Sequence, residues 1–240
     1  MADLAKGEGF QVRATLTGVA ATRDAVSVAM RAAADELNAD AEGKGILFLS
    51  FSGHGSQLPT TGGVFESDHF DETWCLADGS LRDNTIHDLL MSFNPGIRIL
   101  VIAENCYAGG GVELPIGLLG NLKRLRHESP VFTSGGTPLA AGTQANCFGA
   151  PSIHFSKIKA SVLVLAACAE NQQAQPGLFT RHLLAVWRGG FNGTYCEFLD
   201  RIAGLVTPEA IQPQVPTIYM LGPHRPTFAR QRPFSIVSDL

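Results

Sequence analysis

Three runs of consecutive apolar residues divide the chain, and each has the length of a strand. Ile46–Phe51, Ile97–Ala103 and Ser161–Ala167 are almost free of polar interruptions, which is typical of strands buried on both faces of a sheet. Apolar positions in Phe10–Thr17 and Val215–Leu221 predict two further strands. The pattern therefore predicts a sheet with a well-buried centre.

Segments with the apolar spacing of helices lie between these runs. We expect helices at 20–37, 84–93, 179–188 and 195–206, and a loop or short hairpin in the polar stretch 57–82. Strands that alternate with helices predict an α/β fold, in which a mostly parallel central sheet is covered by helices on both faces.

Composition excludes several classes of protein. A length of 240 residues favours one domain, and 45% hydrophobic residues indicate a large core rather than disorder. The net charge of −4 and the absence of a long basic run argue against nucleic acid as a partner. The sequence contains no signal-peptide pattern and no run of 18 apolar residues, so we expect no membrane contact and a cytoplasmic location.

The cysteines are odd in number and form no close pairs, which disfavours a disulfide framework and a zinc knuckle. They are Cys75, Cys106, Cys147, Cys168 and Cys196. We therefore expect reduced thiols, any of which can take part in chemistry.

Two of the predicted buried strands lead directly into residues that can catalyse. His54 follows the first, within Ser52-Gly-His-Gly55, and Cys106 follows the second. Ligands of open α/β sheets bind at the carboxyl ends of the strands. A thiol with a pKa near 8.5 needs a base to supply thiolate at neutral pH, and His54 is the candidate.

Each of these residues has a plainer interpretation when taken alone. A single histidine at a strand end is more often structural, and a single cysteine on a buried strand is more often a small core residue. Together, their 52-residue separation matches the spacing of about 50 between the catalytic histidine and cysteine of caspases. The pair therefore favours catalysis, with the backbone N–H groups of Gly55 and Cys106 facing a substrate carbonyl oxygen.

Four segments resemble the metacaspase type of caspase-like cysteine peptidases (peptidase C14, clan CD). They are Phe51–Gln57, Asp71–Cys75, Ile97–Cys106 and Val162–Cys168. The family usually has Asp-Ser-Cys-His-Ser-Gly where this chain has Glu104-Asn-Cys-Tyr-Ala-Gly109. The resemblance implies a caspase-like three-layer sandwich, with a large-subunit-like part at 1–126, a linker at 127–160 and a small-subunit-like part at 161–240.

The resemblance also implies a reaction, namely peptide-bond hydrolysis through a thioester acyl-enzyme. Cys106 would be the nucleophile, His54 would protonate the leaving amine, and this step needs no metal. Metacaspases cut after arginine or lysine, a preference that would fall on Glu104 here, with Cys168 and Glu170 bordering the substrate pocket. The family often cuts itself in the stretch that corresponds to 107–160, where the basic candidates are Lys123, Arg124, Arg126, Lys157 and Lys159.

Calcium ligands of the family would correspond to Asp71, Asp83, Asn84 and Glu113, whose oxygens suit Ca²⁺. One aspartate of that set has become Asn84, and acidic loops are usually only solvated. On balance these residues do not favour calcium dependence.

The first residues resemble the end of the family's first helix, so we expect the first strand and most of that helix to be missing. That strand belongs inside the sheet, and its loss would leave backbone groups unpaired and apolar surface exposed. A truncated start, another chain that completes the sheet, or a degraded relative would explain the difference, and we favour truncation.

Two alternatives come from other classes of protein. An inactive caspase-like module that binds a peptide or protein is suggested by Tyr107 beside the nucleophile. A serine hydrolase of the α/β type is disfavoured because no Gly-x-Ser-x-Gly elbow follows a buried strand.

Overall fold

The computed structural model describes residues 1–40, 44–59, 70–105, 157–169, 172–223 and 226–237. The helices within these ranges are α1 (Ala2–Gly7), α2 (Arg23–Asn38), α3 (Asp83–Leu90), α5 (Leu178–Arg188), α6 (Tyr195–Glu209) and α7 (Pro226–Arg230), with a 3₁₀ turn at Gly18–Ala20. The strands are β1 (Ile46–Ser52), β2 (Gly55–Pro59), β3 (Phe70–Leu76), β4 (Gly79–Arg82), β5 (Arg98–Glu104), β6 (Ser161–Ala166) and β7 (Thr217–Leu221).

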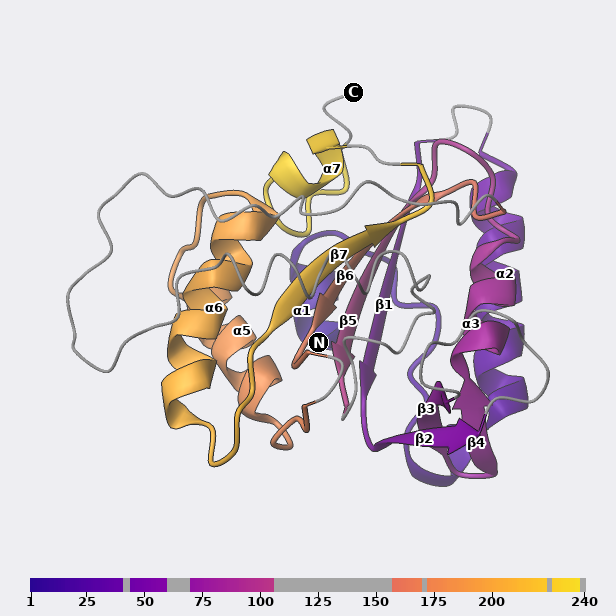
Figure 1. The fold of residues 1–240 in the computed structure, drawn as a ribbon. Helices are drawn as coiled ribbons and strands as arrows, with labels where there is room; N and C mark the ends of the chain where they lie inside the picture. Colours follow the sequence, from indigo (N-terminus) through magenta and orange to yellow (C-terminus); the bar gives the residue numbers. More distant parts are fainter. Residues whose placement is uncertain (41–43, 60–69, 106–156, 170–171, 224–225, 238–240) are drawn as a thin grey trace.

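The main sheet has the order β1-β5-β6-β7. β1, β5 and β6 are parallel, and β7 is antiparallel to β6. Helices α2 and α3 lie on one side of this sheet, and α5 and α6 lie on the other (Figure 1). This three-layer arrangement confirms the predicted α/β sandwich with a mostly parallel central sheet.

The two central strands of the sheet are buried, as the sequence pattern predicts. Every residue of β5 and β6 is buried. β1 differs, because its residues are only half-buried and Ser50 and Ser52 are exposed. The prediction that Ile46–Phe51 is buried on both faces is therefore wrong in this respect, since among the described residues β1 has a strand neighbour, β5, on one edge only.

The segment Phe10–Thr17 also departs from the prediction of a strand. It belongs to no ladder of the described sheets. An isolated extended segment cannot form a strand without a neighbour to bond with. The stretch 57–82, by contrast, contains the predicted hairpin, which the structure extends to a small antiparallel sheet of order β2-β3-β4.

Helix starts follow local sequence signals in two cases. The Thr22 hydroxyl oxygen accepts a hydrogen bond from the Ala25 N–H at 3.2 Å and caps α2. Thr194 and Glu197 form a reciprocal capping box at the start of α6. Such caps satisfy N–H groups that a helix leaves unpaired at its first turn.

The two ends of the chain meet on α5. The indole N–H of Trp187 donates to Glu8 at 3.0 Å, and Arg232 donates to the same carboxylate at 3.2 Å. The Arg232 guanidinium also lies 4.5 Å from the Trp187 ring centre. Residues before α2 are thereby joined to residues after α7.

Arg98, at the start of β5, is buried and holds the C-terminal segment. Its guanidinium donates to Gln231 at 2.8 Å and to the carbonyl oxygens of Ser235, Ile236 and Val237 at 3.3, 2.7 and 3.4 Å. These oxygens converge on one cation, so β5 fixes the path of residues 235–237.

Arg98→Met is expected to release this segment, because methionine fills part of the same space but donates no hydrogen bond. The expected cost is about 2–4 kcal/mol of unfolding free energy, since acceptors near the core lose their donor. Urea unfolding measures this loss, and limited proteolysis should show faster cleavage at 231–237. Cleavage unchanged from the wild type would contradict the anchoring role.

Candidate active site

His54 lies in the connection between the two sheets. The backbone on either side is fixed, because the Gly53 N–H donates to the Glu104 carbonyl at 3.1 Å and the His54 carbonyl accepts from the Cys75 N–H at 2.9 Å. The His54 side chain itself is exposed. The imidazole therefore projects from a backbone that both sheets hold in place.

Gly53 allows an aromatic pair to pack next to His54. A Cβ atom at position 53 would lie 2.9 Å from the Phe51 ring, closer than real Cβ contacts. That ring stacks on Trp74, with 4.4 Å between ring centres and planes 8° apart. Trp74 is buried. The glycine therefore lets the stacked rings support the turn that carries His54.

The parallel register of β1 and β5 brings the two predicted catalytic positions to one end of the sheet. Ser52 pairs with Glu104, and His54 and Cys106 each come two residues after this pair. Adjacent strands lie about 4.8 Å apart, so the two chain segments leave the sheet side by side. Cys106 is outside the described residues, which reach Asn105 here, so the contact between sulfur and imidazole stays a prediction.

Only one of the two predicted oxyanion donors lies within the described residues. Gly55 opens β2, opposite Trp74 in β3. The other donor, the Cys106 N–H, lies outside the described residues. The oxyanion role of the pair stays a prediction.

Glu104 has contacts that the sequence did not reveal. Its Oε1 accepts from the backbone N–H groups of Phe179 and Thr180 at 2.9 and 3.1 Å. Its Oε2 accepts from the hydroxyls of Thr180 and Ser52 at 2.6 and 3.2 Å. Glu104 is 3% exposed, and its carboxylate caps α5 although Glu104 lies far from this helix in the sequence. A negative charge is favourable at a helix N-terminus.

The cap of α5 could have been anticipated from one local signal. Gly177 precedes the helix and offers no side-chain cap, so the first N–H groups of α5 need an acceptor from elsewhere. Thr180 and Ser52 thus belong to the site as partners of Glu104, although the sequence analysis did not single them out. The substrate-binding role of Glu104 stays a prediction.

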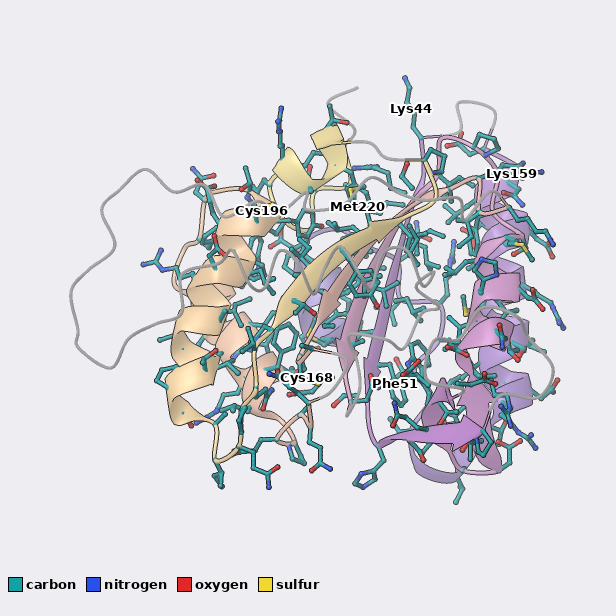
Figure 2. All side chains as sticks on the ribbon, in the orientation of Figure 1. Lys44, Phe51, Lys159, Cys168, Cys196 and Met220 are labelled. Carbon is teal, nitrogen blue, oxygen red and sulfur yellow. The ribbon has the colours of Figure 1, made fainter. Side chains whose placement is uncertain are left out.

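Cys168 follows β6 and is fully buried. Its thiol lies 3.5 Å from the Asn105 carbonyl oxygen and 3.2 Å from that of Gln172. Cys168 and Phe51 lie at the same end of the sheet (Figure 2), where the parallel strands end. Glu170 is outside the described residues, so the proposed border of the substrate pocket is described only at Cys168 and stays a prediction.

The acidic positions named for calcium are described in part. Asp71 is buried and its Oδ2 pairs with Arg82, whereas Asp83 is buried and its Oδ1 accepts from the Asn84 N–H at 2.7 Å. Glu113 is outside the described residues. Within the part of the chain that the structure describes, no group of three or more His, Cys, Asp or Glu side chains could hold a metal ion. The calcium role of these positions stays a prediction.

A mostly parallel sheet flanked by helices, with His54 and the strand leading to Cys106 in register, has the architecture of the caspase-like class. A crystal structure of protein GSU0716 from Geobacter sulfurreducens is similar, with a TM-score of 0.69 and 30% identity over 99% of this chain and 87% of that one.

The family model described as "Metacaspase, peptidase C14 domain" matches residues 11–115. Metacaspase-1B of Aspergillus fumigatus is 35% identical over 81 residues, which cover 32% of this chain and 20% of that protein. Metacaspase-1 of Schizosaccharomyces pombe is 27% identical over 164 residues, which cover 57% of this chain and 38% of that protein. The chain belongs to the metacaspase-type, caspase-like peptidases.

The matched segments span well under half the length of these curated relatives. The family is one of cysteine peptidases, and the chain's own activity, substrates and partners are proposals. Among the described residues, no helix is long and apolar enough to cross a membrane.

Proposed function

We propose that the chain is a cysteine endopeptidase with Cys106 as nucleophile and His54 as its proton-transfer partner. The observation that carries this proposal is the register of β1 with β5, in which each residue follows the Ser52–Glu104 pair by two positions. The family match over residues 11–115 includes both positions and supports it.

In the proposed reaction the Cys106 thiolate attacks the carbonyl carbon of the scissile bond, and a C–S bond forms. The C–N bond then breaks as the protonated His54 gives its proton to the leaving amine. Water attacks the resulting thioester, His54 takes a proton from that water, and the acid product leaves as the thiolate re-forms. The N–H groups of Gly55 and Cys106 would stabilise the oxyanion in both halves.

We propose a preference for arginine or lysine before the cleaved bond, with Glu104 as the source of negative charge. A carboxylate offers about four lone-pair sites, and the four donors from α5 and Ser52 occupy all of them. Glu104 would therefore attract a basic side chain through its charge, while Glu170 and Cys168 border the pocket. Calcium enters only as an activator to be tested.

A reducing compartment suits this chemistry, because an oxidised Cys106 cannot act as nucleophile. The proposed location is therefore the cytoplasm, where thiols stay reduced.

Hydrolysis of fluorogenic peptides ending in arginine, lysine or aspartate tests the function. We expect turnover of the first two by the wild type, measured with Ca²⁺ and with EGTA, and none by Cys106→Ala. Turnover that persists in Cys106→Ala would refute the nucleophile. If neither protein cleaves any peptide while circular dichroism shows both to be folded, the chain is a binding module instead.

A further inference from the structure

Two loops lie side by side at the end of the sheet where His54 lies. One connects β6 to α5 and is described at 168–169 and 172–177, and the other connects α6 to β7 at 210–216. Because β7 is antiparallel to β6, the second loop enters β7 at the end where β6 finishes. Both loops therefore border the edge at which ligands of such sheets bind.

Gln214, in the second loop, is 1% exposed and joins the two loops. Its side-chain N–H donates to the Ala167 carbonyl at 3.0 Å, and its side-chain oxygen accepts from the Gln175 N–H at 2.8 Å. The Gln214 carbonyl accepts from the Thr207 hydroxyl at 3.1 Å, which holds the residue against α6. One buried amide thus fixes the loop after β6 at two points.

Two further glutamines tie the loops together in the opposite direction. The Gln172 side-chain oxygen accepts from the Ala169 N–H at 3.3 Å and from the Val215 N–H at 2.7 Å. The Gln175 side-chain oxygen accepts from the Ile211 N–H at 3.3 Å. Backbone N–H groups need partners, which strands and helices supply from the backbone itself. Here side-chain amides supply them, so the position of both loops depends on the three glutamines.

The loop after β6 touches the strand that leads to Cys106 at both of its ends. At the start of the loop, the Cys168 thiol lies 3.5 Å from the Asn105 carbonyl oxygen. At its end, the first N–H groups of α5 bind the Glu104 carboxylate. A peptide bonded to Cys106 would therefore lie next to this loop. The bonds of Gln214 go to the loop and to α6, so they support the loop from the side away from β5.

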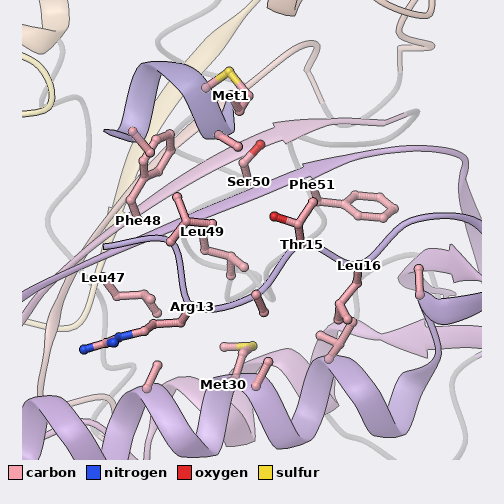
Figure 3. A pocket seen from close by; sticks show the side chains of 18 of the residues that line it. Met1, Arg13, Thr15, Leu16, Met30, Leu47, Phe48, Leu49, Ser50 and Phe51 are labelled. Atoms are coloured by element: carbon pink, nitrogen blue, oxygen red, sulfur yellow. The ribbon is translucent and has the colours of Figure 1, made fainter. Parts of the chain in front are cut away.

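The lining differs at the edge of β1 away from β5. A cavity of about 1120 Å³ lies there, and its lining is mainly apolar, with Leu47, Leu49 and Met30 pointing into it (Figure 3). Apolar contacts are non-directional, whereas a hydrogen bond fixes both distance and angle. The glutamine side of the site is therefore the one that directional contacts hold in place.

We propose that Gln214, together with Gln172 and Gln175, is a positioning residue that fixes the loop after β6 as a wall of the substrate site. This inference rests on the proposed peptidase function. An ordered loop loses little conformational freedom when a peptide binds, whereas a released loop must be ordered by the peptide, and affinity falls. Gln214 therefore acts on substrate binding more than on the bond-breaking step.

Gln214→Met tests the proposal, because methionine has a similar length but neither donates nor accepts. We expect KM for an arginine peptide to rise at least about tenfold, which corresponds to 1.4 kcal/mol, while kcat stays within about threefold. In a Cys106→Ala background, the same substitution should weaken binding of the uncleaved peptide, measured by fluorescence anisotropy. Hydrogen exchange at 172–177 should be faster. An unchanged KM and an unchanged affinity would overturn the positioning role.

Gln231 is the matched control, because it is a buried glutamine at the opposite end of the sheet. It is 6% exposed and accepts from Arg98 at 2.8 Å. Gln231→Met also removes a buried amide, so it should lower the melting temperature while KM stays within about twofold. If Gln231→Met raises KM as much as Gln214→Met does, loss of stability explains both effects and the positioning role is refuted.

Gln214→Glu adds a readout that depends on pH. The neutral acid can donate to the Ala167 carbonyl and accept from the Gln175 N–H, as the amide does, whereas the carboxylate cannot donate. Burial disfavours the charged form and raises the pKa of such a carboxyl. The ratio of its KM to that of the wild type should therefore fall as the pH is lowered from about 8 to about 5. A constant ratio would overturn the role of the donated hydrogen bond.

Gln172→Met gives a second route if Gln214→Met does not fold, because Gln172 is only half-buried and Gln214 stays in place. It should also raise KM, and an unchanged KM would overturn the proposal. Failure of this inference differs from failure of the proposed function. A wild type that cleaves peptides with the same KM as Gln214→Met overturns the positioning role alone, whereas a wild type that neither cleaves nor binds them overturns both.

Discussion

Replacing His54 by alanine is expected to lower kcat/KM for a cleaved peptide by roughly 10²–10⁴-fold, the usual contribution of a general acid–base group. Without the imidazole, Cys106 loses its base and the leaving amine loses its proton donor. The fold should persist, because the side chain is exposed and the hydrogen bonds at this turn come from backbone atoms. Steady-state hydrolysis and thermal unfolding measure the two effects.

The control for His54 is His182, which lies on α5 and contacts Glu209 at 2.7 Å near the surface. His182→Ala should leave kcat/KM within about twofold, as for substitutions away from a site. Combining His54→Ala with Cys106→Ala should cost little beyond Cys106→Ala alone, because groups that act as a unit are not additive. Full additivity, or an active His54→Ala variant, would contradict the proposed pair.

Glu104→Ala is expected to reduce the unfolding free energy by about 3–5 kcal/mol and to abolish hydrolysis. It removes a buried acceptor from two N–H groups of α5 and two hydroxyls, and buried donors left without partners are costly. Because Glu104 ends the strand that leads to Cys106, disorder of its partners would also disturb the nucleophile. Urea unfolding and the peptide assay measure these two losses.

Glu104→Gln separates the structural role from the electrostatic one. The amide can still accept from the Phe179 and Thr180 N–H groups, and hydroxyls can accept from its NH₂ group, so we expect a loss of only about 1–2 kcal/mol. If the charge also attracts substrate, the preference for arginine and lysine should fall while folding persists. An unchanged preference would assign Glu104 to the cap alone.

The sequence predicted the elements whose signals are local. Continuous apolar runs identified β5 and β6, and helical apolar spacing over 20–37 identified α2. The pattern could not predict that Phe10–Thr17 lacks a ladder, because an apolar segment has the same composition whether or not a neighbouring strand is present.

The candidate site was predictable in its strand ends but not in its contacts. Glycines around His54 and the position of Cys106 after a buried run are visible in the sequence. The bond between Glu104 and Thr180 joins residues 76 positions apart, so no local pattern encodes it. The pairing of Ser52 with Glu104 likewise depends on the register of two strands, which only the folded sheet fixes.

The pairing of β5 with β6 has a consequence for any cut between residues 107 and 156. Six residue pairs join β5, which precedes such a cut, to β6, which follows it. The hydrogen bond from Trp187 to Glu8 also joins the part after the cut to the part before it. A nicked molecule would therefore keep both fragments in one particle under native conditions. The fragments would part only in denaturant, so self-cleavage would show on a denaturing gel and leave the elution volume in gel filtration unchanged.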